Sequence, residues 1–454
     1  MVLKPESVAE KFTAARLVAT IRRVLCSLPD ARKGGNNQRY TMGDAGLSAF
    51  SVFFMQSPSF LDFQVRMQKE RGRNNANALF GVHEIPCTQQ ICNLLDPVAP
   101  DDVASAFMEI VAPLATGEAL ASHRTLAGRL LVVLDGTEYH CSEAIHCAQC
   151  STRTLANGKR QYYHTAVTPV IVAPGQASVF PLAPAFVAPQ DGHAKQDCEL
   201  KAGTRWLQRW GAQLAAWRTT VLGDDLYCHQ PFCEQVLAQG CDFIFVCLPG
   251  SHTLLYEWVA DFERTGEVPA RVRTRWTGTQ RLTDTYRWLN ALPLRDGDDA
   301  LHVGWCELTT TDAEGNVLYR NAWASSQPIG AANVVAIVAA GRSRWKIENE
   351  NNNTLKTKGY HFEHNYGHGK QHLAALLASL TLLALLAHTV LALCDHSYRA
   401  VREQLPSRRT FFEHLRAVAQ YWPFDSWQQL FDFMRDALEP APPPTTRRST
   451  ARRR

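Results

Sequence analysis

The sequence lacks the features that place a chain in a specialised class. It has little net charge, since 47 lysines and arginines against 43 acids give only +4 over 454 residues. So small an excess does not by itself indicate a nucleic-acid partner. It also shows no internal repeat. With 46% hydrophobic and 20% charged residues, the composition predicts an ordinary globular protein of two or three domains.

Secretion signals and a disulfide framework are also missing. The first residues, Met1 to Glu6, contain no charged region followed by an apolar core, so we expect no signal peptide. The 13 cysteines are odd in number and scattered along the chain, which favours a reducing compartment. We therefore expect a cytoplasmic protein.

Only one apolar run approaches the length of a membrane span, from His372 to Cys394. It is rich in alanine, contains His388 and follows a very polar segment. These features predict a buried core helix and no membrane partner.

The pattern divides the chain into five regions. Residues 1–125 predict a helical N-terminal domain, with Gly and Asn breaks at 33–37 and 71–75 and a segment at 86–95 that suits either a DNA-binding unit or a plain bundle. Residues 126–250, where apolar runs end in acidic residues, are predicted to form the first part of a catalytic core. A β-rich insertion follows at 251–326, then the second part of the core at 327–395. Residues 396–454 predict helices and, after Pro440, a basic disordered tail.

Within the core we expect strands at 130–134, 162–173, 177–187, 219–222 and 241–247, with helices at 195–216 and up to about 239. Three strands, a helix, a strand, a helix and a strand predict an α/β (α+β) mixed sheet with flanking helices. This order is compatible with an RNase H-like core.

Two predicted strands end in acids, Asp135 and Asp224, and a predicted helix at 344–358 carries Glu348. Phosphoryl transfer by two metal ions needs a few converging carboxylates, and Mg²⁺ or Mn²⁺ suits such ligands. Asp225 competes with Asp224 for the second position. Each aspartate also fits the simpler interpretation of a turn former.

Three segments carry a resemblance: Leu134-Asp-Gly-Thr-Glu-Tyr139, Leu222-Gly-Asp-Asp-Leu-Tyr227, and Arg344-Trp-Lys-Ile-Glu348 followed by Lys356. In this order, over about residues 128–395, they resemble the DDE transposases of bacterial insertion sequences, a family with a Tyr-Arg-Glu-Lys signature. The resemblance implies an RNase H-like core that cleaves and joins double-stranded DNA at terminal inverted repeats and target sites, acting as a homodimer. In a regular helix, Arg344, Glu348 and Asn352 would share one broad face. Arg344 and Lys356 would then flank the metal site and contact DNA phosphates.

Two departures from the signature leave alternatives open. The position of the family's tyrosine falls at Gly341, and Lys356 comes eight residues after Glu348, where the family has seven. Either the helix carries an extra residue or Glu350 is the third ligand. An inactive transposase-derived DNA-binding protein and a stand-alone RNase H-like nuclease remain rival interpretations.

Cysteine and histidine gather just beyond Asp135, at Cys141, His146, Cys147 and Cys150. The Cys147-Ala-Gln-Cys150 spacing is half of a zinc site, which Cys141, His146 or His164 would complete. Two interpretations of this cluster remain open, a structural Zn²⁺ site and a group of reduced thiols.

The insertion mixes arginines with aromatics; they are Arg271, Arg273, Arg275, Trp276, Arg281, Tyr286, Arg287 and Trp288. A turn at 276–280 predicts that Trp276 is exposed, where it would bind DNA together with Arg273 and Arg275. Tyr286 and Trp288 share a strand face with Leu282, so we expect them in the core.

Overall fold

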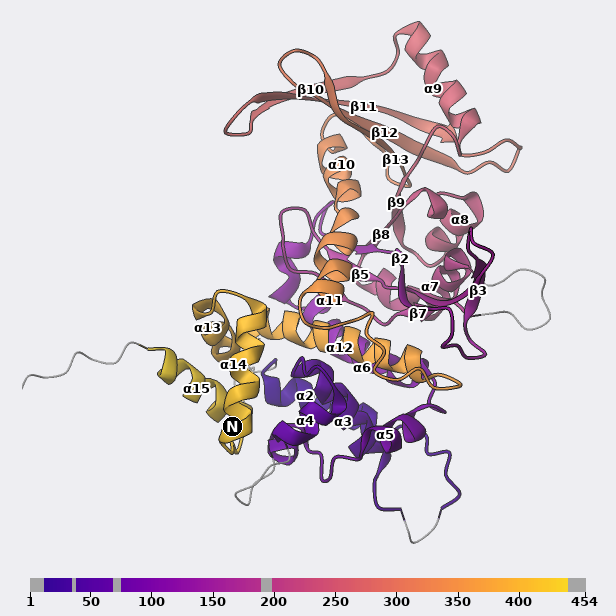
Figure 1. Cartoon of the computed structure of the whole chain (residues 1–454). Coiled ribbons are helices and arrows are strands. Elements are labelled where there is room, and N and C mark those ends of the chain that lie inside the picture. Colours follow the sequence, from indigo (N-terminus) through magenta and orange to yellow (C-terminus); the bar gives the residue numbers. More distant parts are fainter. Residues whose placement is uncertain (1–11, 35–37, 68–74, 189–197, 440–454) are drawn as a thin grey trace, which may run out of the picture.

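The computed structural model describes residues 12–34, 38–67, 75–188 and 198–439. The predicted breaks at 33–37 and 71–75 and the start of the helix predicted from 195 lie partly outside these residues, and the predicted basic tail lies wholly outside them. Figure 1 shows a helical unit at one end, an inserted group of strands at the other and a sheet between them.

The core of the molecule is part of a nine-stranded sheet with the order β10-β11-β12-β13-β9-β8-β1-β5-β6. Its core strands are β1 (Leu130–Val133), β5 (Val170–Val172), β6 (Phe180–Pro181), β8 (Thr219–Gly223) and β9 (Asp242–Val246). β1, β8 and β9 are parallel, whereas β5 is antiparallel to β1 and β6 to β5. β1 and β8 are buried at every position, as expected for parallel strands covered on both faces. The predicted α/β (α+β) mixed sheet with flanking helices is confirmed.

The register places the ends of β1 and β8 side by side. Val133 pairs with Leu222, and the Leu134 amide donates to the Leu222 carbonyl at 2.8 Å. Because both strands run in the same direction, the acids that follow them leave the sheet at one edge.

Two helices connect the core strands, α7 (Glu199–Ala216) before β8 and α8 (Gln230–Ala238) before β9. α7 buries Trp206, Leu207, Trp210 and Leu214, the spacing that one face of a helix requires.

A second sheet, which the sequence pattern did not predict, lies beside the core. It contains β2 (Gly136–Ser142), β4 (Arg160–Val167), β3 (Ser151–Thr154) and β7 (Ala185–Phe186). The predicted strands 162–173 and 177–187 are therefore each divided between the two sheets. Pro169 follows β4 and has no N–H to continue a ladder, so the chain leaves one sheet there and enters the other as β5.

The insertion contains α9 (Thr253–Thr265) and an antiparallel meander of β10 (Ala270–Trp276), β11 (Arg281–Pro293), β12 (His302–Thr311) and β13 (Val317–Ser325). We call β10 to β13 the meander. β13 pairs with β9, with Trp323 opposite Val246, so the inserted strands extend the core sheet.

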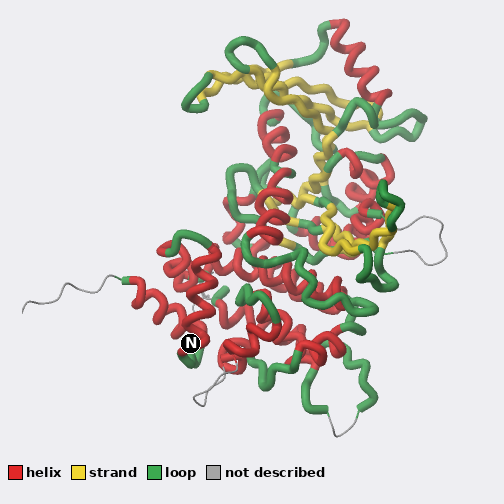
Figure 2. Tube along the Cα trace, viewed as in Figure 1, coloured by secondary structure: helices red, strands yellow, loops and turns green. Residues whose placement is uncertain are grey.

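The helical unit combines both ends of the described chain (Figure 2). Its N-terminal elements are α2 (Ala14–Cys26), α3 (Met42–Phe54), α4 (Phe60–Met67), η1 (Ala76–Phe80), α5 (Thr88–Leu95), η2 (Pro100–Val103), α6 (Ala104–Thr116) and η3 (Glu118–His123). Its C-terminal helices are α13 (His396–Gln404), α14 (Arg408–Tyr421) and α15 (Trp427–Leu438). Trp427 donates to the Leu79 carbonyl at 2.8 Å and Asn75 to the Ala419 carbonyl at 2.7 Å. The two regions that the sequence separates thus pack as one.

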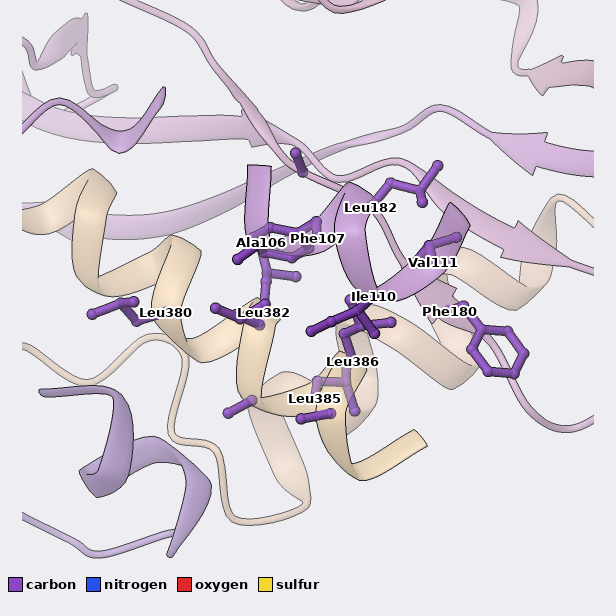
Figure 3. Packing of buried hydrophobic residues seen from close by; sticks show 14 of the residues in the cluster. Ala106, Phe107, Ile110, Val111, Phe180, Leu182, Leu380, Leu382, Leu385 and Leu386 are labelled. Carbon is purple, nitrogen blue, oxygen red and sulfur yellow. The ribbon is translucent and has the colours of Figure 1, made fainter. Parts of the chain in front are cut away.

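The long apolar helix α12 (Leu373–Cys394) lies in the interior, with 89% of its most apolar window buried. Figure 3 shows Leu382 and Leu386 of α12 near Phe107 and Ile110 of α6. By length and composition, α12 is the one helix in the described ranges that could cross a membrane. Its prediction as a buried core helix is confirmed.

Candidate functional site

Asp135 lies at the centre of a group of carboxylates. It directly follows β1 and Leu134, and its backbone carbonyl accepts from the Thr168 amide at 3.0 Å. Burial raises the pKa of Asp135 to about 7; Arg344 opposes the shift, and the charges of Glu199, Asp224 and Glu348 add to it. The charges that act on Asp135 thus come from four segments of the chain, which lie near one another around it.

Asp224 and Asp225, the two candidates for the second acid, have different surroundings. The Asp224 side chain accepts from the Leu226 amide at 3.0 Å. The Asp225 carboxylate instead accepts from the Leu248 amide at 2.8 Å and from the Ser251 hydroxyl. Asp225 therefore holds the loop after β9, which leaves Asp224 as the acid beside Asp135.

Arg344 joins the third acid to the first. Its Nη1 lies 3.3 Å from Glu348 Oε1 and 3.9 Å from Asp135 Oδ2. The Arg344 side chain is only 11% exposed, and its guanidinium lies over the Trp345 ring. The sequence predicted that Arg344 contacts DNA phosphates, but here it faces the acids. The ion pairs of Arg344 within the described residues include Glu348 and not Glu350.

The segment that carries Glu348 is not the continuous helix predicted at 344–358. α10 (Val334–Arg342) ends before Arg344, a π-helical segment η5 (Ile347–Asn352) follows, and α11 (Asn353–Thr357) completes the run. A π-bulge arises when a helix holds one residue too many for α geometry. The eight-residue separation of Glu348 and Lys356 fits an extra residue in the helix, the first of the two alternatives.

The structure also shows the surroundings of Lys356 and Gly341, the two positions that depart from the family signature. Lys356 forms an ion pair with Glu363 at 2.7 Å, so its described partner is an acid of its own chain. A Cβ on Gly341 would lie 2.6 Å from Nε1 of Trp323 on β13. α10 can approach the sheet this closely only because position 341 has no side chain.

Asn352 fixes the π-helical segment against the core. The Thr168 hydroxyl donates to Asn352 Oδ1 at 3.4 Å, and Asn351 donates to the same oxygen at 3.0 Å. Because Thr168 also bonds the backbone of Asp135, one short chain of contacts sets Glu348 and Asp135 relative to each other.

Sequence reasoning missed a fourth carboxylate, Glu199, the first residue of α7. It accepts from the Tyr227 hydroxyl at 2.9 Å, and burial together with Asp224 raises its pKa. A Cβ on Gly136 would overlap the Glu199 carboxylate, so the glycine after Asp135 makes room for it. The one hint of Glu199 in the sequence is the glycine at position 136, which leaves space beside Asp135. A glycine alone does not indicate which residue fills that space.

Four carboxylates thus influence one another at this place, and Arg344 pairs with two of them, Asp135 and Glu348. Like charges gathered in a partly buried place are unfavourable unless cations accompany them. Carboxylate oxygens are the ligands that Mg²⁺ and Mn²⁺ prefer. Burial first, and the neighbouring acids second, raise the pKa of Asp135, and a bound cation would oppose both effects. The donor set therefore fits divalent cations.

The cysteine and histidine cluster differs from its prediction. Cys147, Cys150, His164 and His368 bring their ligand atoms within 4.8 Å of one another. Cys141 and His146 lie outside this group, which corrects the predicted set. Cys141 Sγ accepts from Arg153 at 3.7 Å, and the His146 ring stacks on Tyr162. His368 was not predicted, because it lies 218 residues from Cys150.

On the meander, Trp276 is 67% exposed beside the turn that Thr277 and Gln280 close, as predicted. Tyr286 and Trp288 are buried, also as predicted. Arg275, predicted to bind DNA, is paired with Asp284 at 2.8 Å.

No protein-family model matches the sequence, and the search of curated proteins gave no match. Among solved structures, the chain is similar to piggyBac transposase in a synaptic complex with hairpin DNA. The two share 11% identity over 97% of this chain and 82% of that one, with a TM-score of 0.38. A TM-score this low does not establish a shared fold, so the proposal below rests on the residues of the site.

Proposed function

We propose that the protein is a DDE-type DNA transposase that cleaves and joins DNA ends by phosphoryl transfer with two divalent metal ions. Asp135, Asp224 and Glu348 are the proposed metal ligands. The observation that carries the proposal has two parts. Asp135 and Asp224 follow neighbouring parallel strands, and the charge of Asp224 acts on Asp135. Arg344 links Asp135 to Glu348. Glu199 is a further carboxylate of the same site.

The ligand roles follow from charge and position. Bound Mg²⁺ or Mn²⁺ would polarise the scissile phosphate and make the attacking water or 3′-hydroxyl more acidic. Asp135, central in the group, is the carboxylate best placed to serve both ions. Asp224 directly follows strand β8 of the sheet, and Glu348 lies on the π-helical segment.

Arg344 has a second role in this proposal. Its guanidinium partly neutralises Asp135 and Glu348. Metal ions would take over that neutralisation. Arg344 would then be free to contact a DNA phosphate, as predicted from the sequence.

The meander supplies the proposed contact to the transposon end. Trp276 is exposed, and Arg281 lies opposite it in the β10–β11 register. Arg273 is also exposed. The ion pairs of the described chain include Arg275 and Arg287 but not Arg273 or Arg281. Arg273, Trp276 and Arg281 are therefore the proposed DNA-contacting residues, acting within a homodimer on double-stranded DNA.

The test is an excision assay. A plasmid carries the gene in its native flanking DNA, and the expected result is loss of the segment with joined donor–target products. Asp135→Asn should abolish excision, because the metal ligand is lost while the fold is kept. Asp225→Asn is the matched control: an adjacent acid that holds a loop and should leave excision measurable.

The outcomes separate the rival interpretations. Cleavage without joined products would indicate a stand-alone nuclease. Binding of the flanking DNA with no metal-dependent cleavage would indicate an inactive DNA-binding relative. Equal excision by Asp135→Asn and the parent would refute the assignment of the site.

A further inference from the structure

The cluster of Cys147, Cys150, His164 and His368 lies outside the carboxylate site, and the proposed DNA chemistry does not use it. Cys147 and Cys150 lie in the loop between β2 and β3, and His164 is on β4. His368 belongs to the loop before α12, in a distant part of the sequence. Three of the four are buried, Cys150 at 7%, His164 at 4% and His368 at 7% exposed.

The separations between the ligand atoms match a metal-centred tetrahedron. Zinc bonds to sulfur and nitrogen of ordinary length, at tetrahedral angles, place two sulfurs about 3.8 Å apart and sulfur about 3.6 Å from nitrogen. The two sulfurs are 3.9 Å apart. His164 Nε2 lies 3.5 Å from Cys147 and 3.4 Å from Cys150, and His368 Nε2 lies 3.5 Å from Cys150. A disulfide would need sulfurs at about 2.05 Å.

The surroundings give His368 no other role. Its Nδ1 is buried and has no hydrogen-bond partner, so the polar contact of the ring in the described chain is with the cysteines. Burying an imidazole with so few partners is unfavourable. A metal ion bound at Nε2 would give the buried ring a strong polar partner on the side that faces the cysteines.

We propose that Cys147, Cys150, His164 and His368 bind a structural Zn²⁺ with no open coordination position. Two thiolates balance the charge of the ion, and two neutral imidazoles complete four ligands. Among the described residues, a second group of Cys228, Cys247 and His252 offers three such ligands.

A zinc ion bound here would stabilise the segments that adjoin the carboxylate site. β2 begins directly after Asp135, and its chain leads to Cys147 and Cys150. His368 follows the run of η5 and α11 that carries Glu348. The ion would therefore link the segment that follows Asp135 to the segment that follows Glu348. Its loss should make the distance between these two acids more variable and should lower the stability of the fold.

The test measures zinc on the purified full chain, without DNA, so its result is independent of the proposed transposase activity. Elemental analysis should find about one zinc per chain in the parent. Cys150→Ser and His368→Gln should lose it. Cys141→Ser and His146→Gln, the nearby thiol and imidazole outside the cluster, should keep it.

Cobalt substitution provides a readout that a folding defect does not imitate. Co²⁺ in the parent should give the intense visible absorption of a tetrahedral site with thiolate charge transfer. His368→Cys should retain the metal and strengthen the charge-transfer bands, because a third thiolate joins the set. If Cys150→Ser does not fold, the cobalt spectra of the parent and His368→Cys decide the question.

A parent protein without zinc and without the tetrahedral cobalt spectrum would overturn the proposal. So would zinc retained in both Cys150→Ser and His368→Gln, which would place the metal elsewhere, for example at Cys228, Cys247 and His252.

Discussion

Charged side chains are arranged differently at the ends of β1 and β8 and on the meander. Near the strand ends, Arg344 pairs with Asp135 and Glu348, and the charges of Asp224 and Glu199 add two further acids to the group. On the meander, most charges are matched: Arg275 pairs with Asp284, and Glu307 is shared by Arg287 and Arg320. Buried Glu307 and Asp284 are thereby compensated within the fold.

This difference distinguishes charged residues that stabilise the fold from charged residues that are available to bind a ligand. A matched pair satisfies itself, and removing one partner costs stability. An unmatched acid in a partly buried site is costly in the free protein and is compensated when a cation binds, whereas an exposed unmatched arginine stays solvated and open to an anion. Unmatched acids thus indicate cations, and the unmatched Arg273 and Arg281 indicate phosphates.

The largest effect should distinguish the two glutamates of the π-helical segment. Glu348→Gln should reduce metal-dependent DNA cleavage about a thousandfold or more, because a lost ligand removes several kcal/mol of transition-state stabilisation. Glu350→Gln, two residues away, should leave the rate within about threefold, by the same conversion of free energy into rate. Single-turnover cleavage in Mg²⁺ measures both, and the reverse ranking would make Glu350 the ligand.

The second effect concerns the stability of the metal-free protein. The pKa of Asp135 is about 7 in the fold against about 3.9 in an unfolded chain. Its stabilising contribution is full below about pH 4 and is lost as pH rises to about 7. Asp135→Asn should therefore be more stable than the parent at pH 8, by about 2–4 kcal/mol.

Denaturant unfolding in EDTA from pH 4 to 8 measures this difference. It should be small at pH 4 and grow toward pH 7. Added Mg²⁺ should then stabilise the parent more than the variant. If the difference in unfolding free energy between variant and parent is the same from pH 4 to pH 8, the pKa of Asp135 is not raised in the folded protein.

The third effect tests the cation of the site. Arg344 lowers the pKa of Asp135, so Arg344→Gln should raise it further, by about one unit. Protons would then compete with metal ions up to a higher pH. The pH midpoint of Mg²⁺ binding should move upward by a similar amount. Calorimetric titration at several pH values measures it, with Arg342→Gln, a nearby exposed arginine, as the control.

The sequence predicted those parts of the site that depend on local pattern. β1 and β8 are short apolar runs that end in acids, and such runs can be recognised without a structure. The choice of Asp224 over Asp225 depends on the loop at Leu248 and Ser251. Glu199 and His368 reach their sites through contacts between distant segments. None of these contacts has a periodic signal in the sequence.

Local pattern also failed where backbone geometry departs from the standard periods. The π-helical segment breaks the 3.6-residue repeat that we used to place Arg344, Glu348 and Asn352 on one face. Pro169 divides an apparently continuous β segment between two sheets. Both departures lie beside the acids, and the contacts of Thr168 and Asn352 connect them.

The meander offers two smaller effects, and the first concerns its exposed aromatic residue. Trp276→Ala should weaken binding of an end-containing duplex by about 1 kcal/mol, if the ring stacks on a base or sugar. The salt dependence of binding should stay the same, because stacking releases few counterions. Trp258→Ala, at another exposed tryptophan on α9, is the control. Unchanged affinity would remove Trp276 from the interface.

The smallest effect at any one salt concentration is expected from the unmatched arginines, yet its salt dependence makes it the most specific. Each arginine that neutralises a phosphate contributes about 0.9 to the slope of log affinity against log salt. Arg273→Ala with Arg281→Ala should therefore flatten the slope by up to about two units. Arg275→Ala with Arg287→Ala removes the same formal charge but takes it from ion pairs with Asp284, Glu263 and Glu307. This second pair should lower stability and, by unmasking those acids, weaken binding without reproducing the simple two-phosphate slope. Equal slopes for the parent and the Arg273/Arg281 variant would mean that unmatched charge on the meander does not indicate a DNA contact, and the contrast with the carboxylate site would then hold for the acids alone.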